Sequence, residues 1–332
     1  YQKAKHYQKA KHESTLRNNT ERNKLKIDTI ILYKIIVSIM KIIIENPQKA
    51  DKFATIFQHL KLLTDYVNMN LSESGMYIQC LDTNHCCLFE CELAASWFDT
   101  FEFNPTEDTP CIGIHAATFY KVINIRQEKQ KIEMTSKGMQ VDTINIHFTK
   151  GDNHFDKTFE IPTIELDGEM MEIPKHETAV DVVIDTKRIS ALASELLLFS
   201  EILTLIFSED GIEFIASGSE GKMKSSIDLD EVNEYAVGED MVLKQSYSLK
   251  YLNIMCHFGK LSKEIVLGFG DERPMQLTYN IDEADAEGKA DAEGKADAEG
   301  KADAEGKADT EGVTKYKNLV SFYLAPRIDD DE

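Results

Sequence analysis

Histidine and cysteine gather in one short stretch of the chain, where His85 precedes Cys86 and Cys87, and Cys91 follows. Zinc prefers such ligands, so this stretch is the first candidate for a metal centre. Neighbouring residues of a strand point to opposite faces, however, and the sequence contains no C-x-x-C pair and no second ligand pair. We therefore predict cysteines with a packing role and no bound metal.

No other set of residues is typical of catalysis. The sequence contains no nucleophile elbow, P-loop, G-x-G-x-x-G or H-E-x-x-H motif, and no cluster of carboxylates typical of catalysis. The stretch GFGDE at 268–272 is too short for a phosphate-binding loop and lacks the following helix. We predict that the chain is not an enzyme, has no catalytic residues and needs no cofactor.

Charge sets a second limit on function. The 332 residues include 37 Lys and Arg against 58 Asp and Glu, which gives a formal charge of -21. A chain of this length has room for two or three domains. A protein that binds nucleic acid over most of its surface needs net positive charge there, so the acidic balance disfavours this class of protein. A small basic face on an acidic body stays possible.

Basic side chains do recur on the predicted helices. They are Lys52, Lys61, Lys121, Lys187, Arg188 and Lys250. A basic residue on a helix more often belongs to its solvated face. If repeated units assembled side by side, however, these helices would line one positive surface.

The elements that carry these residues occur twice. Apolar residues at a spacing of three and four predict helices over 48–63, 118–125, 187–199 and 248–255. The turn-and-strand sequence SESGMYIQC at 72–80 has a counterpart in SEDGIEFIA at 208–216. The pattern predicts a duplicated α+β unit with two helices and many strands in each copy.

Three segments fall outside the repeat. Residues 1–39 are a low-complexity, mainly basic extension, and the apolar run 27–44 contains charges that argue against a membrane span. Residues 282–313 hold four copies of ADAEGK and predict a disordered acidic insert. The connector 159–177 carries Met170, Met171 and Ile173 among polar residues, which either pack on the adjacent sheet or wall a groove for a peptide.

Several stretches resemble a known family. They are SESGMYIQCLDTNHCCLFECEL at 72–93, ELDGEMMEIP at 165–174, DGIEFIASGSEGK at 210–222, YSLKYLNIM at 247–255 and FYLAPRIDDDE at 322–332. In order and spacing, residues 40–332 resemble the eukaryotic sliding clamps of the proliferating cell nuclear antigen family and their large-DNA-virus relatives.

The resemblance implies a ring-shaped homotrimer with outer β-sheets and helices around a central pore. Such a clamp encircles double-stranded DNA without sequence preference, is opened by a clamp loader, and tethers DNA polymerase and repair proteins in the nucleus or in a viral replication factory. Lys61, Lys121 and Lys250 match basic pore positions, Lys52 matches less well, and Lys187 and Arg188 lie nearby. Ala191, Ser194 and His257 stand where the family has basic residues.

The resemblance also implies a groove for partner peptides. It maps onto Leu81, His85, Cys86, Leu88, Met171, Ile173, Pro274, Tyr323 and Ala325. The implied domains are 40–160 and 176–332, joined by a connector at 161–175. Two alternatives stay open: a subunit of a heterotrimeric, checkpoint-type clamp, and a monomeric peptide-binding scaffold that has lost the ring.

Overall fold

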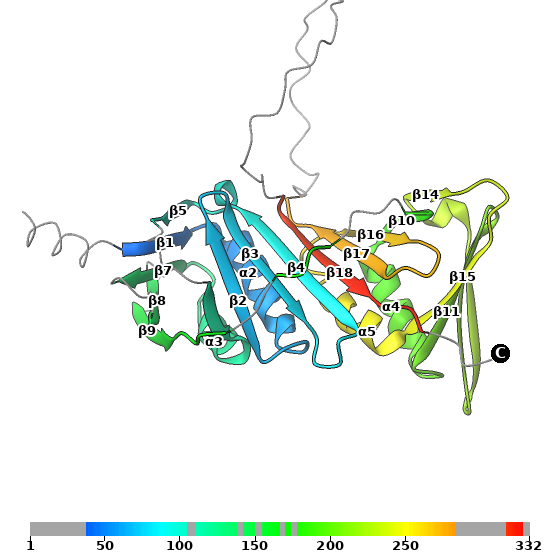
Figure 1. Ribbon diagram of the computed structural model, residues 1–332, viewed down its shortest axis with the longest axis horizontal. Helices are drawn as coiled ribbons and strands as arrows, with labels where there is room; N and C mark the ends of the chain where they lie inside the picture. The colour runs from blue at the N-terminus through cyan, green and yellow to red at the C-terminus, as the bar shows by residue number, and fades with distance from the viewer. Residues whose placement is uncertain are drawn as a thin grey trace, which may run out of the picture.

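The computed structural model describes residues 38–104, 111–137, 142–149, 155–166, 170–173, 178–282 and 317–327. Nearly all of the predicted extension 1–39 and of the predicted insert 282–313 lies outside these residues. The described chain is an elongated α+β structure with a layer of strands in front of a layer of helices (Figure 1).

The described residues of the first half form two α-helices and nine strands. In chain order its elements are β1 (Ser38–Ile44), α2 (Pro47–Leu60), β2 (Tyr66–Ser72), β3 (Gly75–Leu81), β4 (Cys87–Ala94), the short 3-10 helix η1 (Ala95–Trp97), β5 (Thr100–Phe103), β6 (Ile112–His115), α3 (Ala116–Ile123), β7 (Lys131–Lys137), β8 (Thr143–Thr149) and β9 (Lys157–Pro162).

The second half repeats this order element by element. Its members are β10 (Val180–Asp185), α4 (Thr186–Leu196), β11 (Ile202–Ser208), β12 (Gly211–Gly218), β13 (Gly221–Ile227), η2 (Leu229–Glu231), β14 (Glu234–Val237), β15 (Leu243–Ser248), α5 (Leu249–Cys256), β16 (Glu264–Phe269), β17 (Met275–Asn280) and β18 (Leu319–Leu324). The predicted duplication and the four predicted helices are therefore confirmed.

Side-chain caps explain where the helices begin. Asn46 precedes α2 and its Oδ1 accepts the backbone N–H of Gln48 at 2.8 Å, while Pro47 occupies the first turn. Asp185 caps α4 in the same way. Both arrangements satisfy amides that a helix leaves without an intrahelical partner. The predicted helix 48–63 ends earlier, at Leu60, because the chain then enters a turn.

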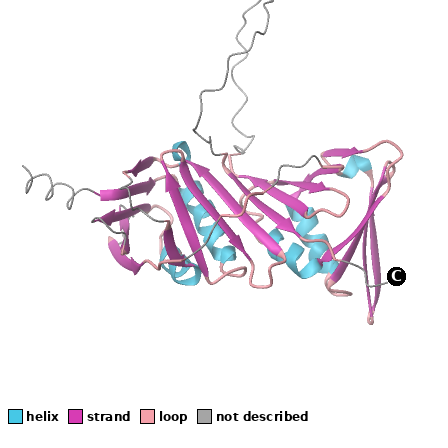
Figure 2. Cartoon of the chain, in the orientation of Figure 1, coloured by secondary structure: helices cyan, strands magenta, loops and turns pink. Residues whose placement is uncertain are grey.

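The strands of the described residues form three sheets, and the central one joins the two halves. Its nine strands follow the order β14-β10-β16-β17-β18-β4-β3-β2-β6. The halves meet where β18 pairs antiparallel with β4, with Phe322 opposite Phe89 and Tyr323 opposite Leu88. A five-stranded sheet ending in β9 and a four-stranded sheet ending in β13 lie toward opposite ends of the long axis (Figures 1 and 2).

An aromatic cluster fills the core under this junction. Phe322 lies 5.4 Å from Phe89 and 4.9 Å from Phe258, measured between ring centroids. All three side chains are fully buried. Because each large apolar side chain contributes about 1.5–3 kcal/mol on burial, the halves share one stable core.

Burial separates the cysteines of the first candidate site. Cys87 and Cys91 face the core beside Phe89, whereas Cys86 is exposed. Burial raises the pKa of the Cys91 thiol well above its ordinary value. Among the residues that the structure describes, no three metal-binding side chains gather. Within the same residues, no helix is long and apolar enough to cross a membrane.

Candidate functional site

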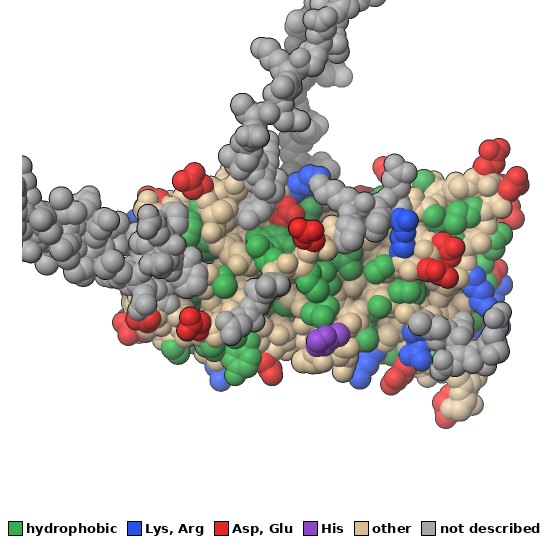
Figure 3. Space-filling view, viewed as in Figure 1, with side chains coloured by type: hydrophobic (Ala, Val, Ile, Leu, Met, Phe, Trp, Pro, Cys, Tyr) green, Lys and Arg blue, Asp and Glu red, His purple; other side chains and the backbone are tan. Residues whose placement is uncertain are grey.

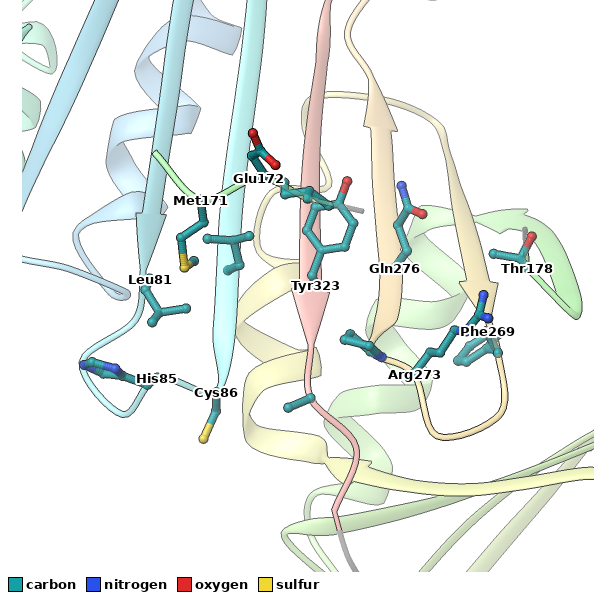
Figure 4. A pocket seen from close by; sticks show the side chains of 15 residues that line it. Leu81, His85, Cys86, Met171, Glu172, Thr178, Phe269, Arg273, Gln276 and Tyr323 are labelled. Carbon is teal, nitrogen blue, oxygen red and sulfur yellow. The ribbon is translucent and has the colours of Figure 1, made fainter. Parts of the chain in front are cut away.

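A cavity of about 400 Å³ opens on the outer face of the central sheet, at the junction of the two halves. All nine residues that the sequence assigns to a groove line it: Leu81, His85, Cys86, Leu88, Met171, Ile173, Pro274, Tyr323 and Ala325. They come from the end of β3, the turn into β4, the start of β4, the connector, the turn before β17, and the end of β18 with the residue that follows it (Figure 4). Hydrophobic side chains form a broad area on this face (Figure 3).

The cavity also has lining residues that sequence reasoning missed. They are Glu172, Thr178, Phe269, Gly270, Arg273 and Gln276. Arg273 directly precedes the predicted Pro274, so its place in the same turn could have indicated that it also lines the cavity. Thr178 and Phe269 come from elsewhere in the second half, and only the folded sheet brings them to the cavity.

Asp82 holds the turn that forms the lower wall. Its Oδ1 accepts the backbone N–H groups of Cys86 and Cys87, both at 2.7 Å, and its Oδ2 accepts that of Asn84 at 2.9 Å. Burial alone would raise the pKa of Asp82, but the hydrogen bonds from Tyr251 and these amides outweigh it and lower the pKa. The same turn places His85 at a φ of 58°, in the left-handed region.

The connector forms the opposite wall. Met171 N–H donates to Oε1 of Gln79 on β3 at 2.7 Å, and Nε2 of Gln79 donates to the Met171 carbonyl at 3.0 Å. The Met171 side chain is 45 % exposed and Met170 is 59 % exposed. Neither side chain is therefore buried against the sheet, and that of Met171 lines the cavity.

Tyr323 crosses the centre of the cavity and has a polar contact beneath it. Its hydroxyl donates to Oε2 of Glu90 at 3.2 Å, and the Tyr77 hydroxyl donates to Oε1 at 2.8 Å. Burial raises the pKa of Glu90. Burial and the nearby Glu90 carboxylate also raise the pKa of Tyr323. A half-buried apolar trough with a few polar groups is suited to binding a short hydrophobic segment of a partner protein.

The predicted DNA-facing residues of the first half differ in their surroundings. Lys61 follows α2, and its Nζ lies 4.3 Å from the ring centroid of Tyr120 on α3. The neighbouring Lys121 is exposed. Lys52 lies nine positions before Lys61, which at 100° per residue puts the two on opposite sides of the helix. The Nζ of Lys52 donates to the Ile281 carbonyl at 2.7 Å, at the base of the β17–β18 hairpin.

In the second half, Lys187 on α4 and Lys250 on α5 are exposed. Arg188 instead forms an ion pair with Glu231 of η2, at 2.9 Å between Nη2 and Oε1. The structure thus brings Lys61 close to the residue before Lys121 and directs Lys52 and Arg188 to partners within the chain.

Family models match nearly all of the folded chain. The model for the N-terminal domain of proliferating cell nuclear antigen matches residues 45–170, and the model for its C-terminal domain matches residues 172–287. The two matches meet at the connector, beside Met171.

Whole-chain relatives agree. Proliferating cell nuclear antigen 1 of Plasmodium falciparum (isolate K1 / Thailand) is 25 % identical over 288 residues, which cover 83 % of this chain and 93 % of the relative. Proliferating cell nuclear antigen of Chaetomium thermophilum is 21 % identical over 292 residues, covering 86 % and 98 %. The Drosophila melanogaster protein proliferating cell nuclear antigen 2 is 22 % identical over 228 residues, covering 69 % and 88 %. With its duplicated α+β fold, the chain belongs to the proliferating cell nuclear antigen family of DNA sliding clamps.

Proposed function

We propose that the chain is a DNA polymerase processivity factor. It forms a ring that encircles duplex DNA and tethers the polymerase and other replication or repair proteins through the groove. The observation that carries this proposal is the cavity itself, because nine residues chosen from separate parts of the sequence surround it. The proposal includes no catalytic step, and the chain acts by holding its partners on DNA.

Assembly as a homotrimer is supported by the ends of the molecule. Strands β9 and β13 are edge strands of separate sheets at opposite ends of the chain. An edge strand presents backbone groups that can pair with another strand. Pairing of β9 with β13 of the next copy is a head-to-tail contact, and such contacts close into rings when the rotation between copies allows it.

The pore surface follows from the helices. Lys61, Lys121, Lys187 and Lys250 lie at or beside the ends of α2–α5 and give each subunit a few cations for loose phosphate contact. A ring holds DNA by topology, so strong phosphate binding is not required and the acidic body is tolerated. The domains are 40–160 and 176–332 with the connector 161–175 between them, a clamp loader opens the ring, and the site of action is the nucleus or a viral replication factory.

Native mass tests the assembly. Light scattering at moderate salt and several protein concentrations should give three times the subunit mass of 37.7 kDa. A monomer at every concentration would reject the homotrimer. The replacement of basic pore positions by Ala191, Ser194 and His257 favours one alternative, a heterotrimer, in which trimers would appear only after partner subunits are added.

Blocked DNA ends test encirclement. A ring can thread onto linear duplex DNA over a free end. Bulky blocks at both ends should therefore abolish binding of the ring to the duplex, although the number of phosphates is unchanged. Equal binding to open and blocked duplexes would indicate surface binding in place of a ring.

A further inference from the structure

The side chain of Gln79 joins the β-sheet to the connector wall of the cavity. Its side-chain amide both accepts from Met171 N–H, at 2.7 Å, and donates to the Met171 carbonyl, at 3.0 Å. A side chain that uses its donor and its acceptor on one residue imitates the pairing of a neighbouring strand. Met171 is 45 % exposed, so apolar packing holds it only in part. The polar pairing with Gln79 therefore also holds the connector in place.

A chain of hydrogen bonds fixes the orientation of that amide. Nε2 of Gln79 also donates to the Tyr77 hydroxyl, at 3.0 Å, and the Tyr77 hydroxyl donates to Glu90 at 2.8 Å. Since Tyr77 gives its one hydroxyl proton to Glu90, its oxygen is left to accept from Gln79. The amide of Gln79 therefore points its nitrogen toward Tyr77 and its oxygen toward Met171 N–H.

The same chain of hydrogen bonds reaches Tyr323 at the centre of the cavity. The second oxygen of Glu90 accepts from the hydroxyl of Tyr323, whose ring lines the cavity. Glu90 lies directly opposite Gln79 in the β3–β4 pairing. Tyr323 on β18 is thus connected to Met171 on the connector through three side chains that lie outside the cavity lining.

We propose that Gln79 is the positioning residue of the partner-peptide groove, and that Tyr77 and Glu90 couple its hold on Met171 to the position of Tyr323. This inference rests on the proposed function, because it assumes that the cavity binds a peptide. A peptide that packs on the Tyr323 ring shifts its hydroxyl against Glu90, and the shift reaches the connector through Tyr77 and Gln79. Tyr323 and the connector then respond to a bound peptide together.

Peptide affinity tests the positioning role. The probe is a short fluorescent peptide whose helical turn carries Leu at position i and Phe at positions i+3 and i+4. Gln79→Ala removes both connector hydrogen bonds and should weaken binding about 5- to 30-fold. Gln58→Ala, on α2 and outside the groove, is the matched control and should bind as the unaltered chain does. An unchanged affinity for Gln79→Ala overturns the proposal.

A double-mutant cycle tests the coupling. Tyr323→Phe keeps the ring in the cavity and removes the hydroxyl that Glu90 accepts. If Tyr323 and the connector are coupled, the double variant Tyr323→Phe, Gln79→Ala loses less binding free energy than the sum of the losses of the two single variants. Tyr77→Phe should abolish that non-additivity, whereas Tyr66→Phe on β2 should leave it intact. Strict additivity in the chain with Tyr77 present overturns the coupling.

Hydrogen exchange separates this inference from the proposed function. The Met171 amide should exchange at least about tenfold faster in Gln79→Ala than in the unaltered chain, with no peptide present. Failure of the unaltered chain to bind the probe would reject the groove function, and exchange at Met171 would still decide whether Gln79 holds the connector. Unchanged exchange at Met171, with the probe bound normally, rejects only the positioning role.

Discussion

Tyr251 on α5 donates its phenolic hydrogen to the carboxylate of Asp82 in the turn between β3 and β4, although 169 residues separate them in the chain. The side chain of Asn84, two residues further along the turn, donates to the same hydroxyl at 2.8 Å. Because Lys250 directly precedes Tyr251, the turn that lines the groove is attached to the helix that carries a proposed DNA contact. The cavity and the proposed DNA surface are thus built on one shared junction between the halves.

Substitutions at this junction should have unequal effects on stability. Tyr251→Phe removes two hydrogen bonds, the one donated to Asp82 and the one accepted from the Asn84 amide. Because Asn84 is exposed and water can replace the second bond, the substitution should lower the free energy of unfolding by about 1 kcal/mol. Asp82→Ala also deprives the Cys86 and Cys87 amides of their acceptor, and should cost about 2 kcal/mol or more. Urea unfolding followed by circular dichroism measures both, with Tyr66→Phe as control. Equal losses for the two variants would show that the Asp82 carboxylate does not hold the turn.

Two side chains in the cavity should anchor a partner peptide. Tyr323→Ala and Met171→Ala each remove apolar contact surface and should weaken binding of the Leu/Phe probe by about 1–3 kcal/mol. Met170→Ala is the matched control, because Met170 is the more exposed neighbour and does not line the cavity. Fluorescence anisotropy measures the affinity. If Met171→Ala and Met170→Ala behave alike, the connector methionines are not anchors.

Local pattern was sufficient to predict the four helices and some of the strands of this fold. Apolar residues at a spacing of three and four fixed α2, because Phe53, Ile56 and Leu60 must share its buried face. Alternation did the same for β4, where Cys87, Phe89 and Cys91 face the core. The cavity lining followed from the family resemblance, since no local rule brings 81–88, 171–173 and 323–325 together.

The contacts that tune the site could not be predicted in this way. Gln79 reaches Met171, and Tyr323 reaches Glu90, only once β18 has paired with β4 and the connector has crossed the sheet. The pairing of Arg188 with Glu231 likewise depends on where η2 lies relative to α4. Sequence spacing places such residues on a face, and the register between distant strands decides what they touch.

Charge reversal should separate the two proposed surfaces. Lys61→Glu, Lys121→Glu and Lys250→Glu together should reduce clamp-dependent DNA synthesis and leave affinity for the Leu/Phe probe unchanged. Each lost phosphate contact should also lower the slope of log affinity against log salt by about 0.9 for duplex DNA. Lys244→Glu on β15 changes the net charge as much as each single reversal does, so it is the control for Lys61→Glu, Lys121→Glu and Lys250→Glu tested one at a time. Equal loss of synthesis and of peptide binding would mean that these residues do not form a separate DNA surface.

His59 should make stability depend on pH at the contact between α2 and α5. Its ring centroid lies 5.5 Å from that of His257. Burial, followed by the charges of His257, Lys260 and Lys61, lowers the pKa of His59 from 6.5 to about 4. As pH falls from about 6.5 to about 4, the unfolded chain binds a proton that the folded chain excludes, so stability decreases across this window.

Two variants isolate this contribution to the pH dependence. His59→Gln removes the titrating group, so its free energy of unfolding should fall less steeply between pH 6.5 and 4 than that of the unaltered chain. His257→Gln removes one repelling charge, so NMR titration should find the pKa of His59 raised, yet still below 6.5 because burial is the larger cause. His147→Gln on β8 controls for the loss of any histidine. Parallel stability curves for His59→Gln and the unaltered chain would show that His59 titrates alike in the folded and unfolded states, and that the α2–α5 contact does not exclude the proton.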